Sequence, residues 1–163
     1  NGADFERSCR FCERSESSIM KKLLKSLLAA MILSGCAAVR YDTAADGVLR
    51  KMNAAYANRD IDAFMQNISP DFTGNVKDLK LAVENDFVGF VSVDFNTYVA
   101  ETVFDKESRV VRAKVLFLRS AKSARFGTDN QSGETTLEFD VDENGDLKLR
   151  DMPYPALYGL ITP

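Results

Sequence analysis

The sequence predicts an α+β domain in which helices pack on one face of a curved antiparallel sheet. Apolar residues recur at helical spacing between residues 42 and 86, and alternation with a period of two replaces this spacing from residue 91 onward. Polar turns, of which Asn144-Gly145 is the clearest, separate the alternating stretches, as is typical of hairpins. Helices that precede a run of hairpins favour segregated layers over a parallel βαβ arrangement.

Three helices are expected before the sheet. The first is expected to begin at Asp42-Thr43 and to end near Asn58. Asp60 is expected to cap a short second helix that ends at Ser69-Pro70, because the residue before a proline disfavours helical angles. A third helix is expected over residues 76–86. The apolar side of the first helix is expected to be Val48, Leu49, Met52, Ala55 and Tyr56.

Four strands are expected after the helices, over residues 91–104, 110–118, 135–141 and 147–150. The stretch from Ala121 to Gly133 is polar and rich in small residues, and is expected to be a loop. Asn144-Gly145 predicts a tight hairpin turn, because both turn positions favour positive φ.

The same turn has the oxygen spacing of a calcium-binding loop. Asp140, Asp142, Asn144 and Gly145 match the first half of an EF-hand loop, and Asp151 stands at the twelfth position. An EF-hand lies between helices, whereas strand-like alternation flanks this stretch. A hairpin is therefore the favoured interpretation and we expect no metal site, with weak adventitious calcium binding as the alternative.

Residues 20–36 resemble the signal of bacterial lipoproteins. A basic start with Lys21 and Lys22 precedes the short apolar core from Leu27 to Leu33, which is too short to span a bilayer. Leu33-Ser34-Gly35-Cys36 then resembles a lipobox. The resemblance implies cleavage between Gly35 and Cys36 and lipidation of the Cys36 sulfur.

The lipoprotein resemblance also implies a location. Residues 20–35 are then a signal peptide, and residues 36–41 are a lipidated tether. Ala37, in place of an aspartate after the cysteine, implies the outer membrane of a bacterial cell envelope, facing the periplasm. We expect a membrane partner through the lipid at Cys36, since several acyl chains hold a protein durably on a bilayer.

Residues 1–19 precede this signal, and we expect them to be an untranslated or disordered extension, with Met20 as the true start. Cys9 and Cys12 form a CxxC pair in this extension. Zinc would need two further ligands, and the chain has no histidine and only one other cysteine. We expect the pair to have no role.

Composition excludes several classes of function. The formal net charge is −3, so the chain is a poor candidate for binding nucleic acid. No cofactor is expected. The absence of histidine excludes Asp-His catalytic dyads, although Asp, Glu, Lys and Tyr remain available for proton transfer.

Residues 42–151 resemble the nuclear transport factor 2-like superfamily, whose sheet folds into a cone around the first helix. The resemblance depends on the order of the elements and on two loose motifs. They are Leu49-x-x-Met52-x-x-x-Tyr56-x-x-x-Asp60-x-Asp62-x-Phe64 and Ser69-Pro70-Asp71-Phe72. The resemblance implies a cone-like fold, and its members include enzymes as well as proteins that only bind ligands or partners.

The ketosteroid isomerases of this superfamily use a tyrosine on the first helix and an aspartate after the short helices. In this sequence Met52 stands at the tyrosine position and Val76 near the aspartate position. Neither side chain titrates, so the resemblance implies no catalytic residue at these positions. We expect a protein that is not an enzyme, while an isomerase, dehydratase or cyclase with other acid-base residues in the cone stays open.

Five aromatic residues are candidates for lining an apolar pocket in the cone, although packing in the core is the favoured interpretation. They are Tyr56, Phe64, Phe95, Tyr98 and Phe117. Residues 152–163 form an apolar tail that either folds back over the sheet or docks to a partner. The expected function is binding of a small apolar ligand or an envelope protein, with a purely structural envelope module and a homodimer as open alternatives.

Overall fold

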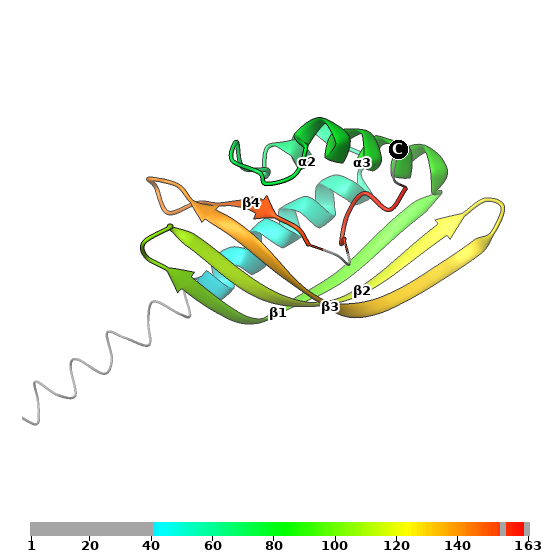
Figure 1. Cartoon of the computed structure of the whole chain (residues 1–163). Helices are drawn as coiled ribbons and strands as arrows, with labels where there is room; N and C mark the ends of the chain where they lie inside the picture. Colours follow the sequence, from blue (N-terminus) through cyan, green and yellow to red (C-terminus); the bar gives the residue numbers. More distant parts are fainter. Residues whose placement is uncertain (1–40, 154–155, 162–163) are drawn as a thin grey trace, which may run out of the picture. The chain divides into compact units, whose positions relative to one another are not determined.

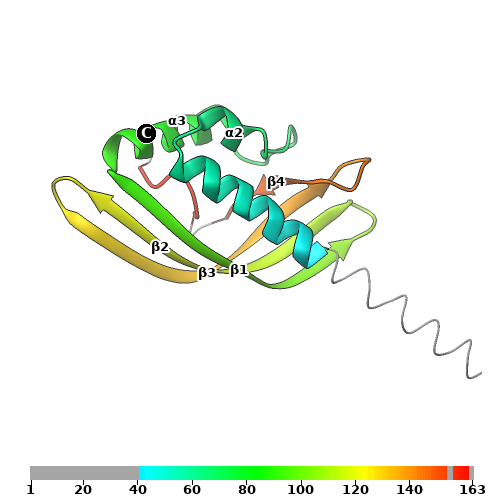
Figure 2. The ribbon, with the colours of Figure 1, turned by 180° about the vertical axis from the view of Figure 1, so that it is seen from behind.

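The computed structural model describes residues 41–153 and 156–161 of the chain. A helix over residues 41–57, drawn in cyan in Figure 1, comes first. The elements that follow are α2 (Ile61–Met65), α3 (Val76–Gly89), β1 (Ser92–Asp105), β2 (Val110–Ser123), β3 (Gly127–Val141) and β4 (Leu147–Asp151). The strands form one antiparallel sheet in the order β1-β2-β3-β4. Figures 1 and 2 show the helices on the concave side of this curved sheet, which confirms the predicted fold class.

The first helix lies along the concave face and buries one side against it. The buried positions follow the helical period, as the apolar spacing predicts. They are Ala45, Val48, Leu49, Met52, Ala55 and Tyr56. Tyr41 is already helical, so Asp42 does not begin the helix as expected. The Asp42 carboxylate instead accepts a hydrogen bond from the Thr102 hydroxyl on β1, which links the helix to the sheet.

Asp60 caps α2 as predicted, and its side chain accepts a hydrogen bond of 2.9 Å from the backbone N–H of Ala63. The expected end of α2 at Ser69-Pro70 is wrong, because the helix ends at Met65. The segment after it pairs with β4: the N–H of Ser69 donates to the carbonyl of Leu149 at 2.8 Å. These sheet-like bonds take the backbone groups that a longer helix would need.

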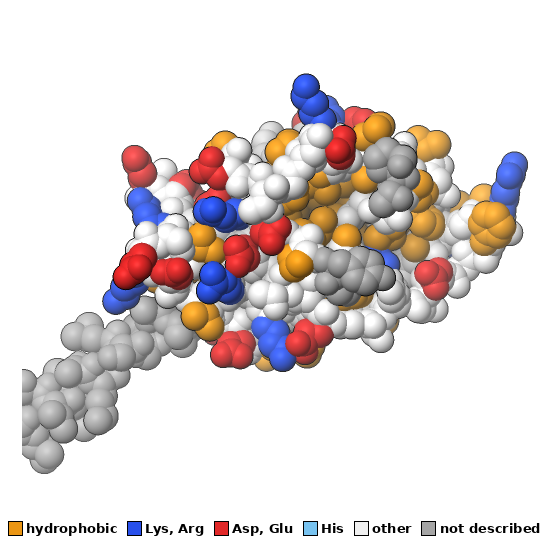
Figure 3. All heavy atoms as spheres, in the orientation of Figure 1, with side chains coloured by type: hydrophobic (Ala, Val, Ile, Leu, Met, Phe, Trp, Pro, Cys, Tyr) orange, Lys and Arg blue, Asp and Glu red, His pale blue; other side chains and the backbone are white. Residues whose placement is uncertain are grey.

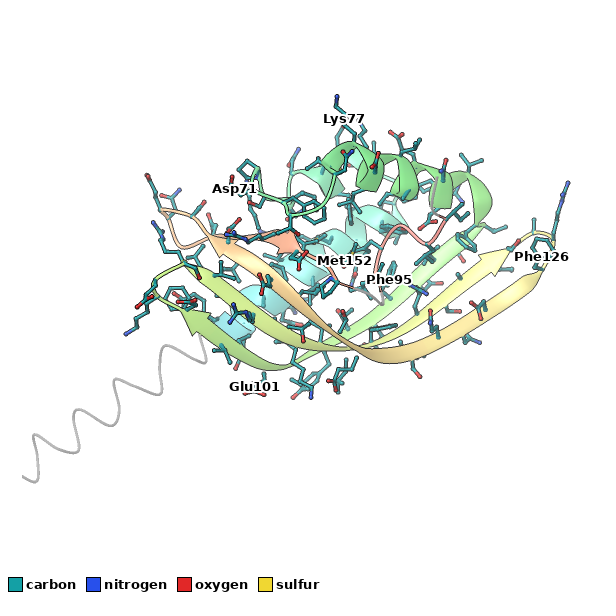
Figure 4. All side chains as sticks on the ribbon, in the orientation of Figure 1. Asp71, Lys77, Phe95, Glu101, Phe126 and Met152 are labelled. Carbon is teal, nitrogen blue, oxygen red and sulfur yellow. The ribbon has the colours of Figure 1, made fainter. Side chains whose placement is uncertain are left out.

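Asn75 caps α3, because its side-chain oxygen accepts a hydrogen bond of 2.9 Å from the N–H of Lys77. We expect Asn75→Ala to lower the free energy of unfolding by about 1 kcal/mol, since an orphan N–H of the first turn loses its partner. Urea denaturation measures the change. The matched control is Lys77→Ala, whose exposed side chain points away from the fold in Figure 4 and should matter by less than about 0.5 kcal/mol. Equal losses in the two variants would contradict the capping role.

β2 alternates between a buried and an exposed face as predicted. Val111, Ala113, Val115 and Phe117 are buried toward the helices, while Leu116 points to the outer, convex face. β1 pairs with β2 along its length, with a register shift between Val99 and Glu101. Figure 4 shows Glu101 pointing away from the helices, on the convex side.

The expected loop over residues 121–133 is wrong, because β2 and β3 continue through it as one long hairpin. Ser123 pairs with Gly127 at its end, and Phe126 at the tip is 90% exposed (Figure 4). Most side chains here lie beyond the helices and face solvent on both sides. Without a buried face there is no alternation for the sequence to show, although the backbone ladder forms.

Asn144-Gly145 lies in the β3–β4 hairpin as predicted, but the turn has a different form. Of its two residues only Gly145 has a positive φ, of 84°. The Asp142 carboxylate closes the turn by accepting bonds of 2.8 Å from the N–H groups of Asn144 and Asp146. The Asp140 carboxylate forms an ion pair with Arg150, with Oδ1 2.9 Å from Nη1. The carboxylates of the turn therefore do not converge on one point, as an EF-hand loop would need.

Candidate functional site

A buried phenol–carboxylate pair lies where the first helix, α3 and the sheet meet. Tyr56 stands on the last turn of the first helix, and its hydroxyl donates a hydrogen bond to Asp86 Oδ2 on α3. Asp86 is fully buried. From the sheet, Phe95 of β1 contacts the Tyr56 ring edge-on, with the ring centroids 5.2 Å apart. Arg119 on β2 is the cross-strand partner of Phe95. We call the region bounded by Tyr56, Asp86, Phe95 and Arg119 the cone mouth.

The C-terminal segment 156–161 lies in the cone mouth. Figures 1 and 2 show it, in red, passing between α3 and the sheet. The N–H of Leu160 donates to Asp86 Oδ2 and the N–H of Ile161 to Asp86 Oδ1, each at 2.7 Å. The N–H of Gly159 donates to the Tyr56 hydroxyl oxygen at 3.2 Å. The buried carboxylate is therefore stabilised by three donors, two of which come from the segment.

Arg119 holds the other end of the same segment. Its Nη1 donates to the carbonyl of Ala156 at 3.1 Å and to the carbonyl of Leu157 at 3.3 Å. Its Nη2 donates to the side-chain oxygen of Gln131 on β3, which fixes the guanidinium plane. Burial lowers the pKa of Arg119. Because the ordinary pKa of a guanidinium is very high, Arg119 keeps its positive charge.

Two side chains of the segment fill the interior below the mouth. Leu157 and Tyr158 are almost completely buried. The Tyr158 hydroxyl donates to Asn53 Oδ1 at 2.7 Å, and Asn53 Nδ2 donates to the Thr97 hydroxyl at 3.1 Å. The Tyr158 ring packs against Phe64 at 5.1 Å. The segment thus completes the aromatic core of the cone.

Burial sets the protonation of the two tyrosines. Desolvation raises the pKa of Tyr56 far above its ordinary value, and the hydrogen bond and charge of Asp86 raise it further. Desolvation alone raises the pKa of Tyr158 in the same way. Both phenols are neutral hydrogen-bond donors at ordinary pH, and the Tyr56 hydroxyl donates to the Asp86 side chain that it faces.

The space left beside this pair is small. A hollow of about 60 Å³ borders Tyr56 and Asp86, which is room enough for water. A wider groove of about 850 Å³ lies outside the core, between the first helix, α2 and the β3–β4 hairpin. Its walls include both polar and apolar side chains, such as Lys51, Ala54 and Lys148. Among the described residues, the space beside Tyr56 and Asp86 is therefore small, and the wider groove lies on the outer surface.

Three of the five predicted pocket residues, Tyr56, Phe64 and Phe117, lie in the core, and Phe95 is half-buried against it. Tyr56, Phe64 and Phe95 contact one another or Tyr158 through their rings, and Phe117 is buried on β2. Tyr98 is placed elsewhere, because 65% of it is exposed on the convex face. It stands an odd number of residues from Phe95 on the same strand, so the two side chains point to opposite faces.

The positions that the resemblance gave to catalytic residues hold no catalytic group. Met52, on the first helix, is fully buried in the hydrophobic core, and Val76 begins α3 with an exposed side chain. Gly35 and Cys36, the expected cleavage and lipidation residues, lie outside the described residues. In the part of the chain that the structure describes, no helix combines the length and apolarity needed to cross a membrane.

Comparison with solved structures identifies the fold. A candidate scytalone dehydratase from Novosphingobium aromaticivorans matches with a TM-score of 0.62 and 9% identity, over 69% of this chain and 81% of that chain. A conserved protein from Planctomyces limnophilus matches with a TM-score of 0.59 and 12% identity, over 69% and 92%. A ketosteroid isomerase-like protein from Erwinia carotovora atroseptica matches with a TM-score of 0.51 and 11% identity, over 65% and 88%.

This domain has a nuclear transport factor 2-like fold. The element order, the curved antiparallel sheet and the helices on its concave face agree with that assignment. No family model and no curated protein matches the sequence. At these identities the likeness concerns the fold alone, so the function of this nuclear transport factor 2-like domain depends on its own residues.

Sequence reasoning missed Asp86 and Arg119, although each carries a weak signal. Asp86 follows Ala82 and Val83 at helical spacing, which places it on the buried side of α3. Arg119 has the same parity on β2 as the buried Phe117. A charged residue at a position whose periodic neighbours are buried indicates a paired or functional group.

Proposed function

We propose that this chain is a lipid-anchored cell-envelope protein whose nuclear transport factor 2-like domain binds a polypeptide partner and has no catalytic role. The lipobox-like Leu33-Ser34-Gly35-Cys36 supports the anchor. Ala37 supports the outer membrane, facing the periplasm, as the location. The closed cone supports a polypeptide partner over a small apolar ligand.

The observation that carries the choice of partner is the seated C-terminal segment. An enzyme or a small-ligand carrier of this fold needs an open interior of a few hundred Å³. Here Leu157 and Tyr158 occupy that interior, and the hollow beside Asp86 is about 60 Å³. The carboxylate and the phenol are engaged with each other and with the backbone of the segment.

Native mass spectrometry of the full chain, purified from the envelope of the cell that produces it, tests this function. We expect the lipidated chain alone or bound to another polypeptide, without a stoichiometric small molecule. A small molecule bound in equal amount would contradict the proposal and would show that the cone opens to hold it.

The anchor has a test of its own. We expect Cys36→Ser to move the protein from the membrane fraction to the soluble fraction or to leave it unprocessed, because the variant lacks the sulfur that carries the acyl chains. Cell fractionation with mass measurement of the chain gives the readout. Ala38→Ser, which keeps the Cys36 sulfur, is the matched control and should leave the membrane fraction unchanged. A processed Cys36→Ser protein that stays on membranes would contradict the lipid anchor.

One observation favours a second candidate function. Tyr56 and Asp86 form a phenol–carboxylate pair inside the cone, and such a pair can transfer protons if the segment leaves. The alternative is an isomerase, dehydratase or cyclase. Turnover of a 3-ketosteroid or of scytalone by the full chain, lost in Asp86→Asn, would favour it over binding alone. We expect no turnover in either protein.

A further inference from the structure

We propose that the cone mouth is a peptide-binding site for an apolar, glycine-containing segment supplied by another protein, and that the chain's own residues 156–161 occupy this site in the structure. The inference depends on the proposed function, because it names the partner class that the domain would bind.

The polar side chains of the cone mouth form hydrogen bonds with the backbone of the segment 156–161. Asp86 accepts from two consecutive N–H groups, those of Leu160 and Ile161. Arg119 donates to two consecutive carbonyls at the other end. Acceptors and donors of this kind recognise any polypeptide in the same conformation, whatever its side chains, as in other modes of peptide recognition.

Side-chain pockets then restrict the sequence. Leu157 and Tyr158 enter the interior, where Asn53 Oδ1 accepts a hydrogen bond of 2.7 Å from the Tyr158 hydroxyl. Gly159 has a φ of 71°, and a Cβ there would lie 3.0 Å from the Ala82 Cβ on α3. The site therefore selects an apolar residue, a tyrosine and a glycine in succession, followed by apolar residues.

The segment is attached in a way that permits exchange. Among the described residues, the hydrogen bonds of 156–161 run to side chains of Tyr56, Asp86, Arg119 and Asn53, and none belongs to the β1–β4 ladder. Departure of the segment leaves the sheet paired. Asp86 then keeps the Tyr56 hydroxyl, and Arg119 keeps Gln131, so the empty mouth stays partly organised.

The first experiment weakens the chain's own segment and supplies it from outside. In Gly159→Val the positive φ and the contact with Ala82 disfavour seating of the segment. A ¹⁵N-labelled peptide with the sequence of residues 152–163 is added to this unlabelled full-length variant. We expect saturable binding, with the peptide's leucine and isoleucine amides taking the chemical shifts that Leu160 and Ile161 have in the unmodified chain. The same peptide carrying Gly159→Val should not bind.

The unmodified chain supplies the second arm, which needs no variant to fold. Its tethered segment competes at an effective concentration on the order of millimolar, so half-saturation by the peptide is expected near that range. In Gly159→Val the peptide concentration at half-saturation should be at least ~10-fold lower, since the tethered segment no longer competes. A folded variant without saturable binding, or an unmodified chain without displacement at several times the competing concentration, would overturn the proposal.

The outcomes separate this inference from the function on which it depends. A stoichiometric small molecule in native mass spectrometry would overturn the proposed function whatever the peptide does. Failure of the peptide to bind, with a chain that carries no small molecule, would overturn only the peptide site. Concentration-dependent dimers that exchange residues 156–161 would assign the occupant to a second copy and overturn the assignment to another protein.

Discussion

Asp86→Ala is expected to lower the free energy of unfolding by about 3 kcal/mol, a large share of the stability of a domain of this size. The substitution removes the acceptor of the Tyr56 hydroxyl and of the N–H groups of Leu160 and Ile161. The buried Tyr56 hydroxyl left without a partner costs about 1–3 kcal/mol. The N–H groups of Leu160 and Ile161 are only part-buried and cost less, because water, including water from the neighbouring 60 Å³ hollow, can replace the carboxylate. Urea denaturation followed by circular dichroism gives the value.

The matched control for Asp86→Ala is Glu84→Ala on the same helix. Glu84 is half-exposed and lies 3.9 Å from Lys80, so its removal should cost less than about 0.5 kcal/mol. The loss of unfolding free energy for Asp86→Asn should lie between those of Asp86→Ala and Glu84→Ala, because one amide oxygen still accepts a hydrogen bond. A loss below about 1 kcal/mol for Asp86→Ala would show that the carboxylate does not hold the C-terminal segment.

Alkaline pH is expected to destabilise the fold through the two buried tyrosines. Their pKa values are raised in the folded state by desolvation, and at Tyr56 also by Asp86. Above about pH 10 the unfolded chain loses these protons while the folded chain keeps them, so stability falls as pH rises toward the folded-state pKa values. Each tyrosine contributes a slope of up to about 1.4 kcal/mol per pH unit.

Urea midpoints measured between pH 9 and 11 test the slope. Tyr158→Phe removes one buried phenol and should reduce the slope to about half, despite the lost hydrogen bond to Asn53. The control is Tyr98→Phe, which removes a hydroxyl from a side chain that is 65% exposed and should leave the slope unchanged. The account would be contradicted by equal slopes in Tyr158→Phe and the unmodified chain.

Local signals were enough to predict most of the fold. The apolar spacing of the first helix, the cap at Asp60 and the alternation of β2 each appear where the sequence places them. These signals depend on a buried face or on a cap a few residues away. The β2–β3 extension around Phe126 lies beyond the helices, so it carries no such pattern and was predicted as a loop.

The cone mouth depends on contacts between residues far apart in the chain, and sequence reasoning did not assemble it. Asp86 and the segment at Leu160 meet across more than seventy residues. The apolar tail suggested two alternatives, folding back or docking, and nothing local chooses between them. What decides is a backbone conformation with Gly159 at positive φ, which turns consecutive N–H groups toward the carboxylate.

Amide hydrogen exchange at Leu160 and Ile161 tests the central claim most directly, namely that Asp86 holds the chain's own C-terminal segment in the cone mouth. In the unmodified full-length chain we expect both amides to exchange far more slowly than in an unstructured peptide. They should exchange at least ~10-fold faster in Asp86→Asn, while Val115 in the centre of β2 changes much less. Exchange of Leu160 and Ile161 at the rate of an unstructured peptide in the unmodified chain would contradict the claim.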